Sequence, residues 1–596
     1  MKIKERIAVF RDKMEKENIA VAVVPTADSH ASEYIADFFK TRQWLCGFTG
    51  SAGTLVVGRE DAALFTDGRY FIQAERQLEG SGVTLMRMLN PGVPTVEEYV
   101  CQLAGKGNAG VDYAVVSDSF AAQLGGKLAA QGAKLCDTGD WFEEIWADRP
   151  ALPKAPAFLL EEKYTGRSVG DKLSAIRKAM DKAGAQLHVT NVLDDIAWVL
   201  NVRGDDVHCT PVVMSYLTIS GNEAIWYVDE DKVSADVREA LLHSGVTVRA
   251  YSAVEEDLHA VAPGTRVMAD KTKLTAKLCA ALCQAEIVQQ ENPAKAMKAI
   301  KNETELANLR LAHIRDGAAV TRLMYWLKKN AGKLPMTELS VTDKLLALRK
   351  EQEGFVEPSF DTICAYRENA AMMHYKATEA SHAVLEPRDL LLIDSGGQYL
   401  EGTTDITRTF ALGEVEAVQK QHFTAVLCSM LNLANAKFLY GCTGIGLDIL
   451  ARGPIWDMGI DYQCGTGHGV GYMLSVHEGP NSFRWYKSAG RNEDTVLEAG
   501  MVTTDEPGVY IRGSHGIRTE NELVCVKLTN NEYGQFMGFE AITCAPIDLD
   551  AVLPEEMTAR QKKWLNEYHA FVREKLMDRM ASEDEKAWLA HATRAI

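Results

Sequence analysis

The chain lacks an excess of positive charge, which limits the partners that it can bind. Its 596 residues include 64 Lys and Arg against 82 Asp and Glu, so the formal net charge is −18 at pH 7. Nucleic acids and anionic lipid surfaces select for clustered basic residues. We therefore expect no nucleic acid and no membrane as a partner. The composition favours a soluble protein that handles small or cationic ligands.

Long apolar runs and paired cysteines are also missing. No run approaches the roughly 18 apolar residues that a membrane-spanning helix needs. The charged N-terminal stretch MKIKERIAVFRDKMEKEN lacks the apolar core of a secretory signal. The 12 cysteines are scattered and none forms a Cys-x-x-Cys pair. Buried reduced thiols in a cytoplasmic protein are the simplest interpretation.

The order of helix-like and strand-like segments predicts three domains. At about 100–200 residues per domain, this length is sufficient for at least three. Alternating helix and strand patterns predict one α/β domain over residues 1–157 and a second over 158–300. Residues 301–596 form the third domain, which opens with an amphipathic helix capped by Asn302 and ends with a helical tail. Three prolines, Pro150, Pro153 and Pro156, mark a linker near the first boundary.

The first two domains are similar to each other. FRDKMEKENIAVAVV (10–24) aligns with IRKAMDKAGAQLHVT (176–190), and three of its residues recur 166 positions later. A tryptophan and then a glycine follow each pair of helix and strand, and further strands recur in the same order. We predict a tandem duplication of one α/β domain. Neither copy carries a cluster of metal ligands or a nucleophile with its base, so we expect both to act as scaffold and to control access.

The stretch LLLIDSGGQYLEGTTDITRTF, residues 390–410, brings two acids together. Two strand-like runs joined by a Gly-rich bend each deliver one aspartate, Asp394 and Asp405, near the same turn. Burying a carboxylate alone is costly, and two adjacent carboxylates repel each other. A divalent cation between them removes both difficulties. On this stretch alone, a surface hairpin with solvated aspartates is the alternative.

Four further motifs in the third domain supply histidines and glutamates. NAAMMHYK places His374 at a strand edge, CGTGHGVG places His468 among glycines, and His477 follows in VHEGP. VTTDEPGVY places Glu506 in an extended run, and GIRTENELV places Glu520 in a strand. A short turn joins these two runs, so a hairpin can bring the two glutamates together.

Charge and ligand type favour two divalent cations. Asp394, Asp405, Glu506 and Glu520 supply four negative charges, which balance two divalent ions, and His468 supplies an imidazole. Oxygen-rich ligation favours a hard metal such as Mn²⁺ over a thiolate zinc site. Two ions about 3.5–4 Å apart can share a hydroxide and stabilise the oxyanion that forms when it attacks a carbonyl. Each motif has an ordinary structural explanation by itself, but together in one domain they are far more specific.

These motifs, in this order, resemble the metal site of the pita-bread metallopeptidases. The segments that carry the likeness are DSGGQYLEGTTD, HGVGYMLSVHEGP, TDEPG and GIRTEN. Within that group the chain is most similar to the three-domain, cytosolic-type Xaa-Pro aminopeptidases (aminopeptidase P), because SEYIADFF, GFTGSAGTLVV and LDDIAWVLNVRG extend the likeness over the first two domains. The resemblance implies two tandem related α/β domains followed by a pita-bread catalytic domain. It also implies removal of the N-terminal residue from peptides with proline in second position.

The resemblance gives each predicted ligand a role. Asp394, Asp405, His468, Glu506 and Glu520 match the family's metal ligands one for one. Asp405 and Glu520 would bridge both ions, Asp394 would complete one, and His468 with Glu506 the other. Glu506 also matches the carboxylate that takes a proton from the bridging water.

Other residues match positions that contact the peptide. His374 and His477 match histidines that can stabilise the developing charge or shuttle protons, with His468 beside them. Arg69, in DGRYF, matches a first-domain arginine that contacts the peptide. Arg518 would lie behind the ligands and orient their carboxylates.

Cys464 departs from the family pattern, which often has a histidine at this position. A thiol is a poorer hydrogen-bond donor and carries no positive charge at neutral pH. In one interpretation Cys464 simply fills space, and the substrate either goes without the histidine's hydrogen bond or receives it from another group. In the other, Cys464 is a redox-sensitive residue beside the metals.

The resemblance further implies a cytoplasmic homodimer whose other partner is the peptide substrate. A prolidase restricted to Xaa-Pro dipeptides remains an alternative, although the long N-terminal part argues against it. A non-catalytic binding protein on the same fold is a second alternative, which the retention of all five ligands disfavours. Metal content would test that alternative, and it would also test a metal-free hydrolase of small amidino compounds.

Overall fold

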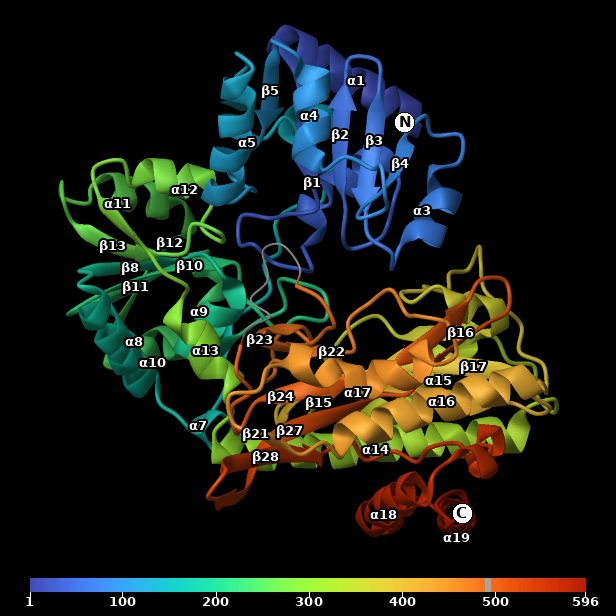
Figure 1. The fold of residues 1–596 in the computed structure, drawn as a ribbon. Coiled ribbons are helices and arrows are strands. Elements are labelled where there is room, and N and C mark those ends of the chain that lie inside the picture. The colour runs from blue at the N-terminus through green and yellow to red at the C-terminus, as the bar shows by residue number, and fades with distance from the viewer. Residues whose placement is uncertain (488–494) are drawn as a thin grey trace. The chain divides into compact units, whose positions relative to one another are not determined.

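The computed structural model describes residues 1–487 and 495–596, which divide into two compact units (Figure 1). The first unit comprises residues 1–161 and 167–294, and the second comprises 162–166 and 295–596. Within the described residues, no helix is both long and apolar enough to cross a bilayer. None of the twelve cysteines, all of which lie in the described residues, forms a disulfide; seven are buried as predicted, but Cys283 is exposed, so the prediction of burial is wrong for that residue.

The first unit contains two six-stranded mixed sheets with the same strand order (Figure 1). In each sheet a central strand, β1 or β8, pairs antiparallel with one neighbour and parallel with the other. The strands of the first sheet, in order, are β4 (Thr84–Arg87), β3 (Ala62–Thr66), β2 (Thr54–Gly58), β1 (Ile19–Pro25), β5 (Asn108–Val111) and β6 (Leu135–Asp137). Those of the second sheet are β12 (Val246–Ala250), β11 (Ala224–Val228), β10 (Ser215–Ser220), β8 (Leu187–Thr190), β13 (Arg266–Ala269) and β14 (Glu286–Gln289).

The helices that precede the central strands confirm the duplication. α1 (Ile3–Lys16) leads into β1, and α8 (Val169–Ala183) leads into β8, 166 positions later. The buried residues repeat at the same interval: Ile7, Phe10 and Met14 in α1, and Leu173, Ile176 and Met180 in α8. The other elements of this unit are α2 (Thr41–Cys46), α3 (Phe71–Leu78), α4 (Val96–Ala104), α5 (Asp118–Ala130), α6 (Phe142–Ile145), α9 (Leu193–Leu200), α10 (Ala235–His243), α11 (Val254–His259), α12 (Ala276–Ala281), β7 (Phe158–Leu159) and β9 (Val202–Arg203).

The second unit places antiparallel strands between helices. Its sheets are β15-β18-β19, β16-β17-β20, β21-β28-β27-β24-β22-β23 and β25-β26. Its helices are α7 (Glu162–Thr165), α14 (Glu303–Asn330), α15 (Glu338–Lys350), α16 (Ala417–Ala434), α17 (Gly444–Trp456), α18 (Ala559–Leu576) and α19 (Glu583–Ala592), and α13 (Pro293–Ala299) begins in the first unit and ends in this one. The strands are β15 (Phe355–Pro358), β16 (Ile363–Tyr366), β17 (Leu390–Ser395), β18 (Gly397–Tyr399), β19 (Gly402–Thr403), β20 (Ile406–Ala411), β21 (Phe438–Leu439), β22 (Gly467–Gly469), β23 (Glu478–Phe483), β24 (Val502–Asp505), β25 (Gly508–Ile511), β26 (His515–Arg518), β27 (Asn521–Asn531) and β28 (Gly534–Ala541).

Strand β17 is buried on both of its faces, which explains the unbroken apolar run LLLI. Leu390 packs in a cluster with α16, whereas Leu391 packs in a cluster with α14 and α15. Helix α14 begins at the predicted cap, where Asn302 and Glu305 form a capping box. The packing holds β17 rigidly between helices.

The connection between the two aspartates is more elaborate than the predicted Gly-rich bend. β17 pairs antiparallel with β20, and Asp394 lies opposite Thr407. Between them, β18 and β19 form a small hairpin that belongs to another sheet. Because Thr403 pairs with Gln398 in that hairpin, β20 begins only at Ile406. Asp405 therefore lies just before its strand and not within it.

Candidate metal centre

The two aspartates lie in the second unit with buried side chains. Asp394 is 8% exposed and Asp405 is 4% exposed. The backbone N–H of Asp405 donates to Glu522 Oε1 at 2.8 Å, and Asp394 Oδ2 accepts a short hydrogen bond from Arg518 Nη2. Arg518 thus holds the Asp394 carboxylate, and Glu522 holds the backbone of Asp405. Because both side chains are buried, the alternative of a solvated surface hairpin is wrong.

The two glutamates lie where a pair of strands passes from one sheet to another. β24 pairs with β27 and β25 pairs with β26, so Glu506 falls between β24 and β25. Glu520 falls between β26 and β27, and the prediction that it lies within a strand is wrong. Its N–H and side chain instead turn to Thr407, whose carbonyl accepts the N–H at 3.2 Å and whose hydroxyl donates to Oε2 at 2.7 Å.

His468 lies in the short strand β22, with one ring nitrogen directed at the carboxylates. Its Nδ1 lies 2.9 Å from the carbonyl oxygen of Gly469, so Nδ1–H donates there and Nε2 faces the carboxylates. Nε2 lies 3.5 Å from Asp405 Oδ2 and 3.5 Å from Glu506 Oε1. A Cβ at Gly467 would lie 1.8 Å from the Thr504 carbonyl oxygen. The strands β22 and β24 can therefore approach each other this closely only with glycine at this position.

The acidic side chains form one electrostatic cluster. The ligand atoms of Asp405, His468 and Glu520 all lie within 4.8 Å of one another. Burial, and then the neighbouring carboxylates of Asp394 and Glu506, raise the pKa of Asp405 well above its ordinary value. Burial and Asp405 raise the pKa of Glu520 in the same way. Such a set of oxygen and imidazole donors fits divalent cations, which neutralise the repulsion between the acids.

Arg518 connects the cluster from behind. Besides Asp394, it donates from Nε to Thr407 Oγ1 at 3.1 Å and from Nη1 to the Tyr510 hydroxyl at 2.5 Å. Because Thr407 also donates to Glu520, Arg518 links two predicted ligands through one buried hydroxyl. This geometry suits the predicted orienting role.

The remaining predicted residues of the second unit are His477, His374 and Cys464. The His477 and His468 rings are edge to face, with centroids 4.3 Å apart. His374 does not lie at a strand edge, because η4 (Arg367–Ala371) precedes it and the chain turns there. Burial raises the pKa of the Cys464 thiol to about 12, with the Glu506 carboxylate adding to the shift.

Arg69 lies in the first unit, so its predicted contact with the peptide stays a prediction. Its guanidinium makes a bidentate ion pair with Asp67, with Nε–Oδ1 at 2.8 Å and Nη2–Oδ2 at 2.7 Å.

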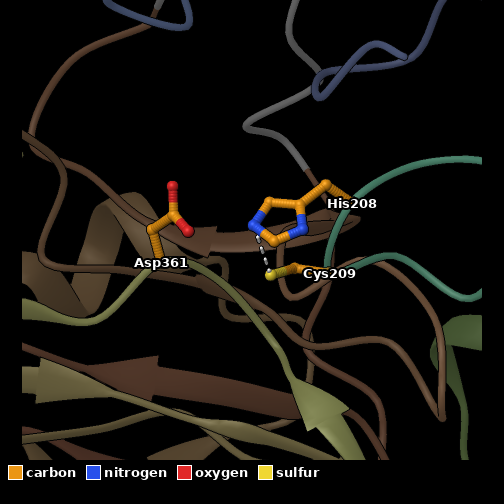
Figure 2. A group of neighbouring side chains, drawn as sticks. All are labelled: His208, Cys209 and Asp361. Carbon is orange, nitrogen blue, oxygen red and sulfur yellow. Dashed lines mark hydrogen bonds between the residues drawn. The ribbon is translucent and has the colours of Figure 1, made fainter. Parts of the chain in front are cut away.

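The first unit also contains His208 and Cys209, whose Nε2 and Sγ are 3.3 Å apart (Figure 2). Asp361, also drawn there, belongs to the second unit. Two neighbours on one loop are too few ligands for a metal site.

Sequence reasoning missed Thr407, Tyr510 and Glu522. Thr407 and Glu522 each lie two positions after a predicted ligand, and alternation along an extended chain places such residues on the ligand's face. That signal could have identified both of them. The position of Tyr510 depends on the pairing of β25 with β26, which local sequence does not show.

Comparison with known proteins gives the chain its family. Residues 307–527 match metallopeptidase family M24, and 535–596 match the C-terminal region of that family's peptidases. Residues 6–145 and 148–305 each match the creatinase/prolidase N-terminal domain. The chain is 38% identical to "Aminopeptidase P2" of Arabidopsis thaliana over 96% of this chain and 86% of that protein.

The chain belongs to metallopeptidase family M24. It has two tandem creatinase-type N-terminal domains followed by the family's pita-bread domain, which confirms the predicted fold class. A "Probable Xaa-Pro aminopeptidase P" of Paracoccidioides brasiliensis is 37% identical over 99% of both chains.

Two solved structures separate the aminopeptidase P type from the smaller members. The X-prolyl aminopeptidase of Caenorhabditis elegans, described as a cytosolic enzyme with a di-nuclear active site, covers 100% of both chains with a TM-score of 0.94 at 31% identity. An Xaa-Pro dipeptidase from Bacillus anthracis covers only 64% of this chain and 99% of its own, with a TM-score of 0.51 at 26% identity. The full-length likeness places the chain in the aminopeptidase P group.

Proposed function

We propose that this metallopeptidase removes the N-terminal residue from peptides that carry proline in second position. It is an Xaa-Pro aminopeptidase with a dinuclear active site. The observation that carries the proposal is the convergence of Asp405, His468 and Glu520 within 4.8 Å, in a chain whose whole length matches aminopeptidase P.

The five predicted ligands would hold two Mn²⁺ ions. Asp405 and Glu520 would serve both ions, as the family resemblance implies; they are also the two most deeply buried carboxylates of the set, at 4% and 1% exposed. Asp394 would complete one ion, and His468 with Glu506 the other. When bound, the ions polarise the scissile carbonyl and lower the pKa of the attacking water.

The chain's own residues would position the reactants and move the protons. Glu506 Oε1 accepts a weak hydrogen bond from Thr504 at 3.3 Å and lies beside His468, where it can take a proton from the attacking water. His477 borders His468 and can donate to the peptide as charge develops on its carbonyl oxygen. His374 and Arg69 would hold the peptide. Arg518 keeps Asp394 and Glu520 aligned throughout.

An assay with three substrates in the presence of Mn²⁺ tests the proposal. We expect cleavage of an Xaa-Pro dipeptide and of an Xaa-Pro-Xaa tripeptide, and no cleavage of an Xaa-Ala-Xaa tripeptide. Cleavage of the dipeptide alone would identify a prolidase. Efficient cleavage of the alanine peptide would refute the proline specificity.

A cytoplasmic homodimer is the form in which we expect the enzyme to work. In the second unit, α17 and the turn after it expose Ile449, Leu450, Trp456 and Met458 by 38–49%, and Trp485 packs edge to face on Trp456. Such an apolar surface suits a subunit contact. Light scattering should give twice the chain mass for the wild type and a lower mass for Ile449→Glu. A monomeric wild type would refute the dimer.

A further inference from the structure

Helix α14 carries a buried ion pair that lies behind the predicted metal ligands. Asp316 of α14 and Arg349 of α15 are 0% and 1% exposed. Arg349 donates to the Asp316 carboxylate through Nε at 2.6 Å and through Nη2 at 3.0 Å. Although burial favours the neutral acid, the Arg349 guanidinium lowers the pKa of Asp316, so the pair stays ionised.

The pair is bonded to the neighbours of both aspartate ligands. Thr404, which precedes Asp405, donates from Oγ1 to Asp316 Oδ2 at 3.0 Å. Arg349 Nη2 donates to the Oγ of Ser395, which follows Asp394, at 3.1 Å. A single ion pair therefore bonds the chain neighbour of each of the two aspartates.

Further hydrogen bonds make this connection stiff. Tyr399, in the hairpin between the two aspartates, donates to Asp316 Oδ1 at 2.9 Å. The N–H of Gly397 donates to Thr404 Oγ1 at 2.9 Å, so the hydroxyl both accepts and donates. Tyr399 and Thr404 are fully buried. Water does not reach these side chains, so a bond that is broken leaves a buried polar group without its partner.

We propose that Asp316 and Arg349 are positioning residues that fix the separation of Asp394 and Asp405 before any cation binds. Two carboxylates that repel each other move apart unless the backbone beneath them is held. The ion pair holds that backbone through the Thr404 and Ser395 hydroxyls, so the cost of bringing the acids together is met during folding and not during metal binding. Both side chains are buried, and the inference concerns affinity for the metal.

Calorimetric titration of the full, chelator-stripped chain with Mn²⁺ tests the role through two variants at one position. Thr404→Val removes the hydroxyl that bonds Asp316 and keeps the side-chain size. Residues that orient ligands from behind typically contribute 10–100-fold to metal affinity, so we expect at least a tenfold weaker binding of Mn²⁺. Thr404→Ser restores the hydroxyl and should bind within about twofold of the wild type.

Asp548→Asn is the matched control for a general loss of stability. Asp548 is also buried and pairs with Lys328 of the same helix α14, but it bonds the N–H of Ala411, at the far end of β20. This variant should lower the melting temperature and leave Mn²⁺ affinity unchanged. Asp316→Asn, if it folds, should behave as Thr404→Val does.

Two results would overturn the proposal. One is Thr404→Val binding Mn²⁺ as tightly as the wild type. The other is Asp548→Asn losing as much affinity as Thr404→Val, because the effect would then follow stability and not the link to the ligands.

Discussion

Replacing Glu520 by glutamine should affect stability in opposite directions with and without metal. The ligand atoms of Asp405 and Glu520 lie within 4.8 Å of each other. At an effective dielectric constant of about 20, two unit charges at that distance repel by about 3.5 kcal/mol. The metal-free wild type relieves part of this repulsion by binding a proton, so Glu520→Gln should stabilise the metal-free protein by about 1–3 kcal/mol. The amide oxygen can still accept the hydroxyl of Thr407.

Thermal unfolding of wild type and Glu520→Gln, each in excess chelator and in excess Mn²⁺, measures this effect. At about 2 °C per kcal/mol for a domain of this size, the variant should melt about 2–6 °C above the wild type in chelator. In Mn²⁺ the order should reverse, because the wild type gains more from binding. If the variant melts no higher than the wild type in chelator, or if chelation leaves the wild type unchanged, the carboxylates do not repel as described.

Three further predictions concern single residues. Glu506→Ala should abolish turnover and leave the circular dichroism spectrum unchanged; substantial remaining activity would show that another group takes the proton. Cys464→His should keep activity and lose it to peroxide at the wild-type rate, because a thiol of pKa about 12 is a slow nucleophile; a more resistant variant would favour the redox role. Burial lowers the pKa of His569, which accepts the Ile547 N–H, to about 3, so stability falls as pH drops through the unfolded value near 6.5. From pH 7 to pH 5 this histidine should cost about 2 kcal/mol of unfolding free energy, and His569→Asn should reduce the loss measured by denaturant titration; an unchanged loss would assign it to other groups.

The duplication could be predicted because it is written in local patterns. The apolar positions of α1 recur in α8 at one constant interval. Each helix leads into the central strand of its sheet. Helical and strand periodicity depend on neighbours a few residues apart, which the sequence shows directly. The shared order of the two sheets follows from the duplication.

The five clustered residues could also be named, but not their local geometry. The acids and His468 stand out because buried charge needs a partner. Where Glu520 lies depends on β26 and β27 belonging to different sheets, and where Asp405 lies depends on the β18-β19 hairpin. Both are consequences of pairing between distant segments, which local patterns do not determine.

The ion pair behind the site was beyond prediction for the same reason. Asp316 and Arg349 lie on two amphipathic helices, where a charged residue usually marks the solvent face. In the folded chain both are nevertheless buried and paired with each other. The sequence contains the residues of this network, but no regular spacing between them indicates that they contact one another.

Anomalous diffraction from Mn²⁺-loaded crystals, collected at the manganese absorption edge, tests the central claim most directly. Two peaks should appear about 3.5–4 Å apart. Both should contact Asp405 and Glu520, one should also contact Asp394, and the other His468 and Glu506. A single peak, or peaks that leave Asp405 and Glu520 without a bridging role, would contradict the dinuclear site described for this chain.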